Sequence, residues 1–282
     1  MTIEDLLREG TTELGAAGLT EAGAEAALLL GDLLGLDRLG LRARGEHPVP
    51  GQIAVAFRER MARRAQHEPA AYILGYRDFY KHRFRVTSAV LIPRPETEFL
   101  VERALEADLP TGARVLDLCC GSGCVGTSLQ RERPNWHLTC SDISAPALAL
   151  ARENALAICG PDAAEAGRPT FVESDLFENI SHRDFHAILC NPPYIHPDEA
   201  RGLDPGLSYE PSGALYHPDP EAFSLRILSE AAERLVPGGL LVLESGPRWT
   251  RILATRARSS YKNVRIETDL AGLERTLVAF SR

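Results

Sequence analysis

Alternation between short apolar runs and helical patterns, from residue 113 onward, is the feature that most constrains the fold of this chain. The apolar runs predict seven strands, at 113–119, 136–142, 169–174, 185–191, 240–245, 263–269 and 275–280. Helical spacing predicts helices over 122–132, 145–158, 221–236 (ended by Pro237-Gly238-Gly239) and 247–260. Repeated strand–helix units form a parallel sheet with helices on both faces, and the short final connection requires an antiparallel pair. We expect an α/β domain with a seven-stranded, mostly parallel sheet whose last strand is antiparallel.

The stretch from residue 1 to about 75 differs, because its pattern is helical throughout. Thr2 and Asp5 have the spacing of a weak capping box at the start of a first helix. Apolar residues recur every four positions from Ile53 to Ala65, which predicts an amphipathic helix. We therefore expect a separate bundle of three to five helices over residues 1–75.

Residues 76–95 join these two parts. The segment GYRDFYKHRFRV places Phe79 and Phe84 among polar residues, as in a short hairpin, and the prolines of the following LIPRPETE favour an extended backbone. We expect a hairpin linker at 76–95, and the α/β domain then covers 96–282.

Composition removes several classes of protein. The 282 residues carry 31 Lys and Arg against 39 Asp and Glu, a net charge of −8, which disfavours a dedicated nucleic-acid binder. The first ten residues do not read as a secretory signal, and no apolar run reaches the ~18 residues of a membrane helix. The six cysteines lie in or beside apolar runs rather than at framework spacings, which favours reduced thiols and a cytoplasmic protein. Three of them, Cys119, Cys120 and Cys124, are near one another but lack the partners of a zinc site, so we expect small core residues and no metal.

Two strand ends suggest a nucleoside ligand. The segment from Val115 to Gly123 (VLDLCCGSG) lies between a strand and a helix, where a glycine-rich turn lets the backbone approach a ligand closely. Asp142 ends the next strand, and an acid there can accept hydrogen bonds from both ribose hydroxyls. Each feature also has a plainer interpretation: a tight turn without a ligand, and Asp142 or Ser144 as a helix N-cap.

The most specific motif is Asn191-Pro192-Pro193-Tyr194, which follows the apolar strand FHAILC. A planar nitrogen is a poor nucleophile because its lone pair is delocalised, so it must be held with that lone pair aimed at a methyl donor. The Asn191 side-chain oxygen and the Pro192 carbonyl can each accept one of its N–H groups. The prolines stiffen the turn, and Tyr194 offers an aromatic face. Positioning and electrostatic stabilisation then suffice without an obligatory general base.

Together these residues resemble the class I S-adenosylmethionine-dependent methyltransferases of the NPPY type, which have a Rossmann-like domain. The chain also resembles one particular group of these methyltransferases. The segments AAYILGYRDFYKHRFRV, LIPRPETEFLVERAL, LDLCCGSGC, NPPYI, YEPSGAL and LVPGGLLVLESG occur in an order similar to the protein-(glutamine-N5) methyltransferases of peptide chain release factors, the HemK family. The resemblance covers essentially the whole chain.

This resemblance implies a function and a site. The methyl donor would be S-adenosylmethionine, leaving S-adenosylhomocysteine, and the acceptor would be the glutamine of the Gly-Gly-Gln motif of a class-1 release factor, gripped by the N-terminal bundle. The implied cofactor residues are Asp117, Cys119, Cys120, Gly121, Ser122, Gly123, Asp142, Leu176 and Asn191. The implied substrate residues are Asn191, Pro192, Pro193 and Tyr194, of which Asn191, Pro192 and Tyr194 would be catalytic. We also expect a monomer, and the charge balance and the lack of a long apolar run predict no direct binding to nucleic acid or membrane.

Three positions depart from the family pattern. Cys119 replaces the first glycine of the cofactor turn, where a Cβ restricts φ. Leu176 stands where an aromatic residue is frequent, so adenine would meet an aliphatic surface. YHPDPEAF, at 216–223, replaces a glycine-rich stretch.

Other interpretations stay open at this point. An NPPY turn also serves amino groups of nucleic-acid bases, although such enzymes should carry a basic region. Another glutamine-containing protein or a small-molecule amide could be the substrate, or the chain could bind the cofactor without catalysis. Glu96 and Glu98 could close over the cofactor or act as helix-start charges. The arginines of the fourth helical segment could form a solvated face or contact a partner; they are Arg58, Arg60, Arg63 and Arg64.

Overall fold

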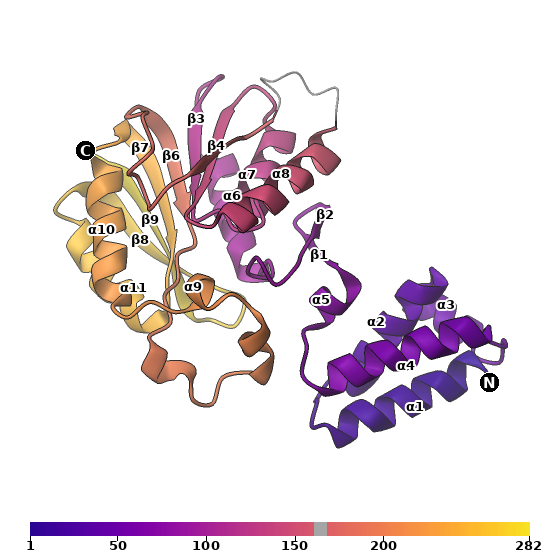
Figure 1. The fold of residues 1–282 in the computed structure, drawn as a ribbon. Coiled ribbons are helices and arrows are strands. Elements are labelled where there is room, and N and C mark those ends of the chain that lie inside the picture. Colours follow the sequence, from indigo (N-terminus) through magenta and orange to yellow (C-terminus); the bar gives the residue numbers. More distant parts are fainter. Residues whose placement is uncertain (161–167) are drawn as a thin grey trace. The chain divides into compact units, whose positions relative to one another are not determined.

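The chain divides into two compact units in this computed structural model, which describes residues 1–160 and 168–282. The first unit comprises Met1–Tyr76 together with Asp204–Tyr209, and the second comprises Arg77–Leu203 and Glu210–Arg282. Figure 1 labels their elements, and each unit is described by itself. None of the helices in the described ranges is long and apolar enough to cross a bilayer.

The first unit is a bundle of five helices, within the expected three to five. They are α1 (Ile3–Ala16), α2 (Ala22–Leu34), α3 (Arg38–Ala43), α4 (Gly51–Ala65) and α5 (Ala70–Leu74). The expected capping box is confirmed, because the side chains of Thr2 and Asp5 each accept from the other's backbone N–H. Leu6, Leu30 and Phe57 are fully buried in its core. Each such side chain contributes about 1.5–3 kcal/mol to the stability of the bundle.

The arginines of α4 differ in exposure: the side chains of Arg58 and Arg63 are exposed, whereas those of Arg60 and Arg64 are partly buried. Arg64, with a side chain only 12% exposed, pairs with Glu25. All four arginines form ion pairs inside the helical unit: Arg58–Glu9, Arg60–Asp32, Arg63–Glu68 and Arg64–Glu25. These pairs join α4 to α1, to α2 and to the turn before α5.

The second unit alternates strands and helices as expected. Its strands are β1 (Tyr76–Phe79), β2 (His82–Arg85), β3 (Arg114–Leu118), β4 (His137–Asp142), β5 (Thr170–Glu173), β6 (Phe185–Cys190), β7 (Leu235–Glu244), β8 (Tyr261–Thr268) and β9 (Glu274–Ser281). Its helices are α6 (Glu98–Glu106), α7 (Cys124–Glu132), α8 (Ala145–Cys159), α9 (Ser212–Leu215), α10 (Pro220–Ala232) and α11 (Pro247–Ala257). The β1–β2 pair forms the expected hairpin, and Phe79 and Phe84 pack into the core of this unit.

Seven strands form one sheet in the order β5-β4-β3-β6-β7-β9-β8. The pairs from β5 through β7 are parallel, and the last strand, β9, is antiparallel to both neighbours, which confirms the predicted α/β class. The chain leaves β3 toward β4 but leaves β6 toward β7. The adjacent carboxyl ends of β3 and β6 therefore form a topological switch point, the usual position of a ligand in such sheets.

Helices cover both faces of this sheet (Figure 1). Because side chains alternate along a strand, Leu116 and Ile188 pack with α10 and α11 on one face. Val115 and Ala187 pack with α6 and α7 on the other. This alternation explains why the central strands read as continuous apolar runs.

One expectation near the end of the sheet was wrong in detail. Helix α10 ends at Ala232, and the Pro-Gly-Gly segment belongs to β7, which begins at Leu235. A register shift between Phe185 and Ala187 accommodates the extra residues, and Gly238 takes φ of +80° there.

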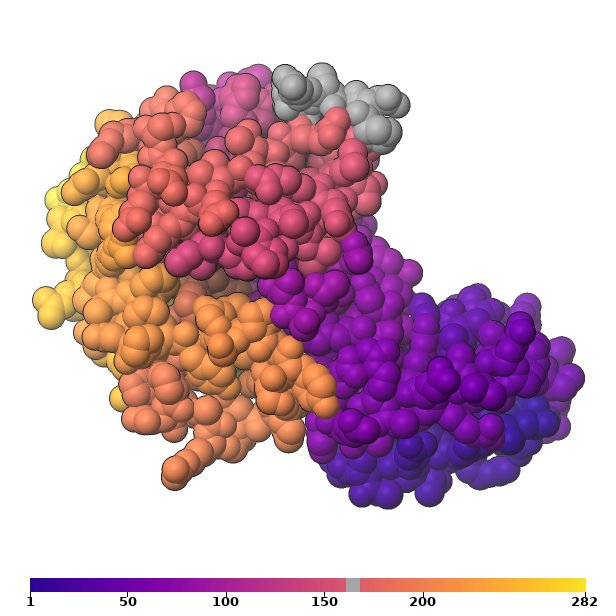
Figure 2. All heavy atoms as spheres, viewed as in Figure 1, coloured from indigo at the N-terminus to yellow at the C-terminus, as the bar shows by residue number. Residues whose placement is uncertain are grey.

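Residues 192–220 form a long connection between β6 and α10 that contains short helical turns. They are Pro197–Ala200, Pro205–Tyr209 and α9. Ile195 and Tyr216 form an isolated parallel bridge that closes the base of the loop. Most residues from 197 to 203 are exposed, and this coral segment lies at the surface of the face drawn in Figure 2.

Candidate active site

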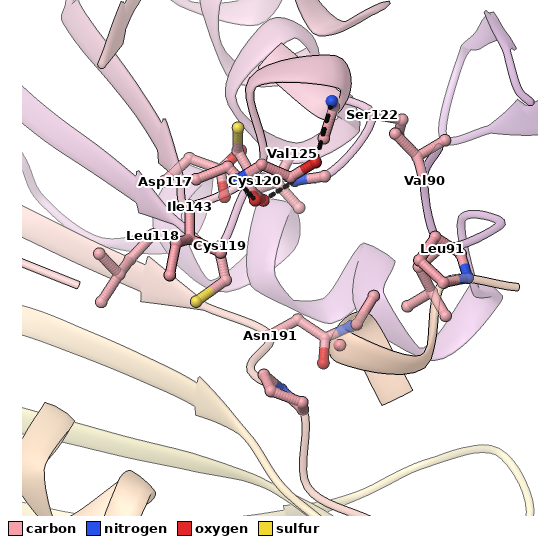
Figure 3. Close-up of a pocket in the computed structure, with 18 of the residues that line it drawn as sticks. Val90, Leu91, Asp117, Leu118, Cys119, Cys120, Ser122, Val125, Ile143 and Asn191 are labelled. Atoms are coloured by element: carbon pink, nitrogen blue, oxygen red, sulfur yellow. Dashed lines mark hydrogen bonds between the residues drawn. The ribbon is translucent and has the colours of Figure 1, made fainter. Parts of the chain in front are cut away.

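A cavity of about 530 Å³ opens at the switch point of the sheet. It brings together most residues predicted for the site: Asp117, Cys119, Cys120, Gly121, Ser122, Asp142, Leu176, Asn191 and Pro193 line its wall. Gly123, Pro192 and Tyr194 are not in the lining. In Figure 3, Asn191 lies across the cavity from the turn that carries Cys120 and Ser122, while Val90 and Leu91 form another side.

The turn after β3 has an unusual backbone. Cys119, Gly121 and Gly123 all have positive φ, of 60°, 52° and 75°. This conformation folds the chain tightly between β3 and the N-terminus of α7, whose first N–H groups have no partner within the helix. For the non-glycine Cys119 the left-handed region costs about 1 kcal/mol, so surrounding contacts must hold this residue in place.

The side chains of Cys119 and Cys120 point in opposite directions (Figure 3). Cys120 is buried with Cys140 and Leu148, whereas Cys119 packs against the core that contains Cys190. Contact with Cys140 and burial raise the pKa of the Cys120 thiol, and burial raises that of Cys190. These neutral thiols are unsuited to nucleophilic chemistry and act as small core groups.

Asp142 holds the turn from the side. Its two carboxylate oxygens accept one backbone N–H each, from Gly121 and from Ser144, both at 2.9 Å. Each oxygen keeps a further lone pair for a ligand. Burial raises the pKa of Asp142, and the backbone N–H groups of Ser144, Gly121 and Ile143 oppose that shift. The N-cap of α8 is Ser144, which accepts from Ala147, so the alternative role of Asp142 as an N-cap is wrong.

A second carboxylate, Asp117, lies deeper at the end of β3. It accepts the N–H of Gly126 at 2.9 Å. Burial raises the pKa of Asp117 to about 7, and Asp142 adds to the shift. When ionised, Asp117 and Asp142 give this wall of the cavity a negative charge, which favours a cationic ligand.

Leu176 and Ile143 add aliphatic surface to the same cavity. Leu176 is 4% exposed and has a positive φ of 45°, which is uncommon for a leucine. This pair supplies the apolar part of a mixed pocket of the kind that binds nucleosides.

The turn after β6 is anchored by two residues that the motifs did not single out. The Asn191 amide donates from Nδ2 to Thr97 Oγ1 at 3.0 Å, and the Tyr194 hydroxyl donates to Glu244 Oε1 at 3.1 Å. Thr97 in turn donates to Glu244 Oε2 at 2.7 Å. A carboxylate at the end of the apolar run LLVLE was the only available signal for Glu244.

The RPETE segment contributes a threonine to the cavity, and its two glutamates lie at helix starts. Thr97 lines the cavity, but Glu96 and Glu98 do not. Glu98 accepts the backbone N–H of Tyr80 at 2.9 Å, which ties α6 to the hairpin. Glu96 and Glu98 lie in the first turns of Pro95–Thr97 and α6, which agrees with the alternative role of helix-start charges.

Glu210 fastens the segment that precedes Thr97. It is 7% exposed and accepts the backbone N–H of Ile92 at 2.9 Å and the Arg94 side chain. The sequence LIPRPE is thereby bound to YEPSGAL, although the two lie more than a hundred residues apart. Both segments line the cavity.

The strand order and the two turns at the switch point define a Rossmann-like methyltransferase domain. Residues 95–203 match the family model described as "Methyltransferase small domain", and residues 5–75 match "PrmC N-terminal domain". Among solved structures, a methyltransferase from Pyrococcus furiosus shares the fold with a TM-score of 0.50 and 17% identity, covering 70% of this chain and 87% of that one.

Curated relatives show which group of methyltransferases this chain resembles. A release factor glutamine methyltransferase of Leptospira interrogans is 39% identical over 98% of this chain and 97% of its own length. One from Cereibacter sphaeroides is 37% identical over 99% of this chain and 98% of its own. This chain belongs to the release factor glutamine methyltransferase family.

Proposed function

We propose that this protein transfers a methyl group from S-adenosylmethionine to the side-chain amide nitrogen of the glutamine in the Gly-Gly-Gln motif of a class-1 peptide chain release factor. The observation that carries the proposal is that one cavity is lined by both the glycine-rich turn after β3 and the Asn191 turn after β6. The names of the relatives support the choice of substrate.

The cavity fits this methyl donor. Asp142 has unused lone pairs that would accept from the two ribose hydroxyls. Asp117 and Asp142 offer negative charge to the cationic sulfonium and ammonium groups. Leu176 and Ile143 would contact the adenine. When bound, S-adenosylmethionine supplies an activated methyl group on a positively charged sulfur.

The residues after β6 would position the acceptor. An amide nitrogen carries two hydrogens, and Asn191 Oδ1 and the Pro192 carbonyl would each accept one. This arrangement aims the nitrogen lone pair at the donor and stabilises positive charge that develops on nitrogen. Pro193 in the wall and Tyr194, bonded to Glu244, would hold that geometry rigid.

The helical unit would bind the body of the release factor, while the second unit holds the glutamine and the donor. We infer a cytoplasmic monomer, since its substrate works in translation. The net charge of −8 supports a protein substrate over a nucleic-acid base.

Substitution of Asn191 by alanine tests the proposal. We expect Asn191→Ala to abolish methylation of a full-length release factor and to leave the donor dissociation constant within about threefold, since Asp142 and the turn after β3 remain. The measurements are mass spectrometry of the Gly-Gly-Gln peptide and calorimetry with S-adenosylmethionine. Asn135→Ala, at an exposed position outside the cavity, is the matched control.

Two results would count against the proposal. A wild-type protein that binds the donor but leaves the release factor unmethylated would refute the substrate. An Asn191→Ala variant with normal turnover would refute the positioning role.

A further inference from the structure

A buried series of hydrogen bonds links the two ends of the Asn191 turn through residues from other elements. It runs from Asn191 to Thr97, from Thr97 to Glu244 and from Tyr194 back to Glu244. Thr97 is 4% exposed and Glu244 is 1% exposed. Thr97 ends the short helical turn before α6, and Glu244 ends β7, so three elements meet at the cavity wall, which Thr97 and Asn191 line.

The direction of each hydrogen bond follows from chemistry. An ionised carboxylate can only accept, and Glu244 has one donor on each oxygen. The one hydrogen of the Thr97 hydroxyl is given to Glu244. Thr97 can then serve Asn191 only as an acceptor, so the Asn191 amide must present its NH₂ group to Thr97. The amide oxygen, Oδ1, is thereby left for another donor.

Opposing effects act on the charge of Glu244. Burial raises the pKa of Glu244, and Glu96 adds to that rise, whereas the hydrogen bonds from Thr97 and Tyr194 and the guanidinium of Arg275 on β9 stabilise the ionised carboxylate. A buried charge with two hydrogen bonds and a cation nearby is compensated, whereas an unpartnered one would be costly.

We propose that Thr97 and Glu244 are positioning residues of the methyl transfer: they set the rotational state of the Asn191 amide so that its oxygen, and not its NH₂ group, is available to the glutamine N–H. The inference rests on the proposed function. With the amide rotated by 180°, two donors would face each other and the glutamine would lose an acceptor. The hydrogen bonds of Thr97 and Glu244 are therefore required for Asn191 to accept an amide N–H of the substrate.

Thr97→Val and Thr97→Ser form the test pair. Valine keeps the shape but has no hydroxyl, whereas serine keeps the hydroxyl. Because loss of orientation at a reacting group costs about tenfold to a hundredfold in rate, we expect Thr97→Val to lower kcat on the release factor by that amount. The dissociation constant of S-adenosylmethionine should stay near the wild-type value. Thr97→Ser should restore most of kcat.

Three outcomes overturn the inference while wild-type methylation stands. They are a Thr97→Val variant with wild-type kcat, a Thr97→Ser variant as slow as Thr97→Val, and a loss expressed entirely in donor binding. A failure of wild-type methylation would instead refute the proposed function.

A measurement on the unsubstituted protein keeps the test independent of whether Thr97→Val folds. The Asn191 side-chain NH₂ signals can be assigned in a nitrogen-15 spectrum by their loss in Asn191→Ala. The Asn191 Nδ2 hydrogen that is bonded to Thr97 should exchange with solvent more slowly than the side-chain hydrogens of the exposed Asn135. Exchange at the rate of Asn135 would overturn the inference, with or without substrate.

Discussion

At the scale of single residues, burial raises the pKa of Asp117, and the charge of Asp117 in turn affects the binding of a cationic ligand. The Asp117 side chain is enclosed at the end of β3, one N–H from Gly126 satisfies it, and its pKa is raised to about 7. Below that pH it is neutral, and above it the cavity gains a negative charge. Ligand binding that depends on this charge should therefore weaken as the pH falls.

This predicts a pH dependence of donor affinity. Between pH 8 and 6 the dissociation constant of S-adenosylmethionine should rise, by at most about tenfold per pH unit for one linked proton. 5′-Methylthioadenosine keeps the nucleoside but lacks both positive charges, so its affinity should change less. Asp117→Asn should flatten the curve for the donor. Calorimetry across this range checks the prediction, and parallel curves for the two ligands would contradict it.

At the scale of elements, the packing of α7 leaves no space for a side chain at Gly126. A Cβ added there would lie 2.3 Å from Cys140 Sγ and 3.2 Å from Asp117 Oδ2. The absence of a side chain lets the helix contact both β3 and β4, and it brings the Gly126 N–H onto Asp117. In α1, by contrast, a Cβ on the exposed Gly15 meets nothing within 4 Å.

The same substitution should consequently have opposite effects in these two helices. Gly126→Ala should lower the free energy of unfolding by at least about 2 kcal/mol, because overpacking forces the backbone to move. Gly15→Ala should raise it by about 0.5 kcal/mol, since alanine restricts the unfolded chain and suits a helix. Urea denaturation measures both. A Gly126→Ala protein as stable as the wild type would show that the packing is looser than described.

At the scale of the whole molecule, the protein has two units with separate cores. On the proposed function, the helical unit binds the release factor and the second unit binds the glutamine and the methyl donor. Leu39 on α3 is 73% exposed, which makes it a candidate contact for a protein partner. A short Gly-Gly-Gln peptide would contact only the second unit.

Full-length release factor and peptide should therefore respond differently to a change at Leu39. Leu39→Asp should lower kcat/KM on the full-length factor by about fivefold to tenfold, the effect of losing a buried interface leucine, with no change on the peptide. Leu270→Asp, at a 95% exposed position in the second unit, is the matched control. If kcat/KM fell equally on the full-length factor and on the peptide, Leu39 would not act by binding the release factor.

Local pattern was sufficient for most elements of this fold. The strands from β3 to β6 and the helices α7 and α8 were predicted to within two residues, because apolar periodicity reports burial directly. The start of β7 was not predicted. Pro237-Gly238 resembles the end of a helix, and only the pairing with β6 shows that it belongs to a strand. A bulge is a property of two strands, and one strand does not reveal it.

The sequence by itself determined the α/β class, the helical bundle and the motifs that meet at one cavity, because each depends on spacing along the chain. Only the tertiary structure decided what supports Asn191. Thr97 and Glu244 are separated by 147 positions, and a hydrogen bond between them requires the sheet to be assembled. The same holds for Glu210, which binds Ile92 and Arg94 although they lie more than a hundred residues away in the sequence. Periodicity records which side chains are buried, but the partner that satisfies a buried polar group is chosen in three dimensions.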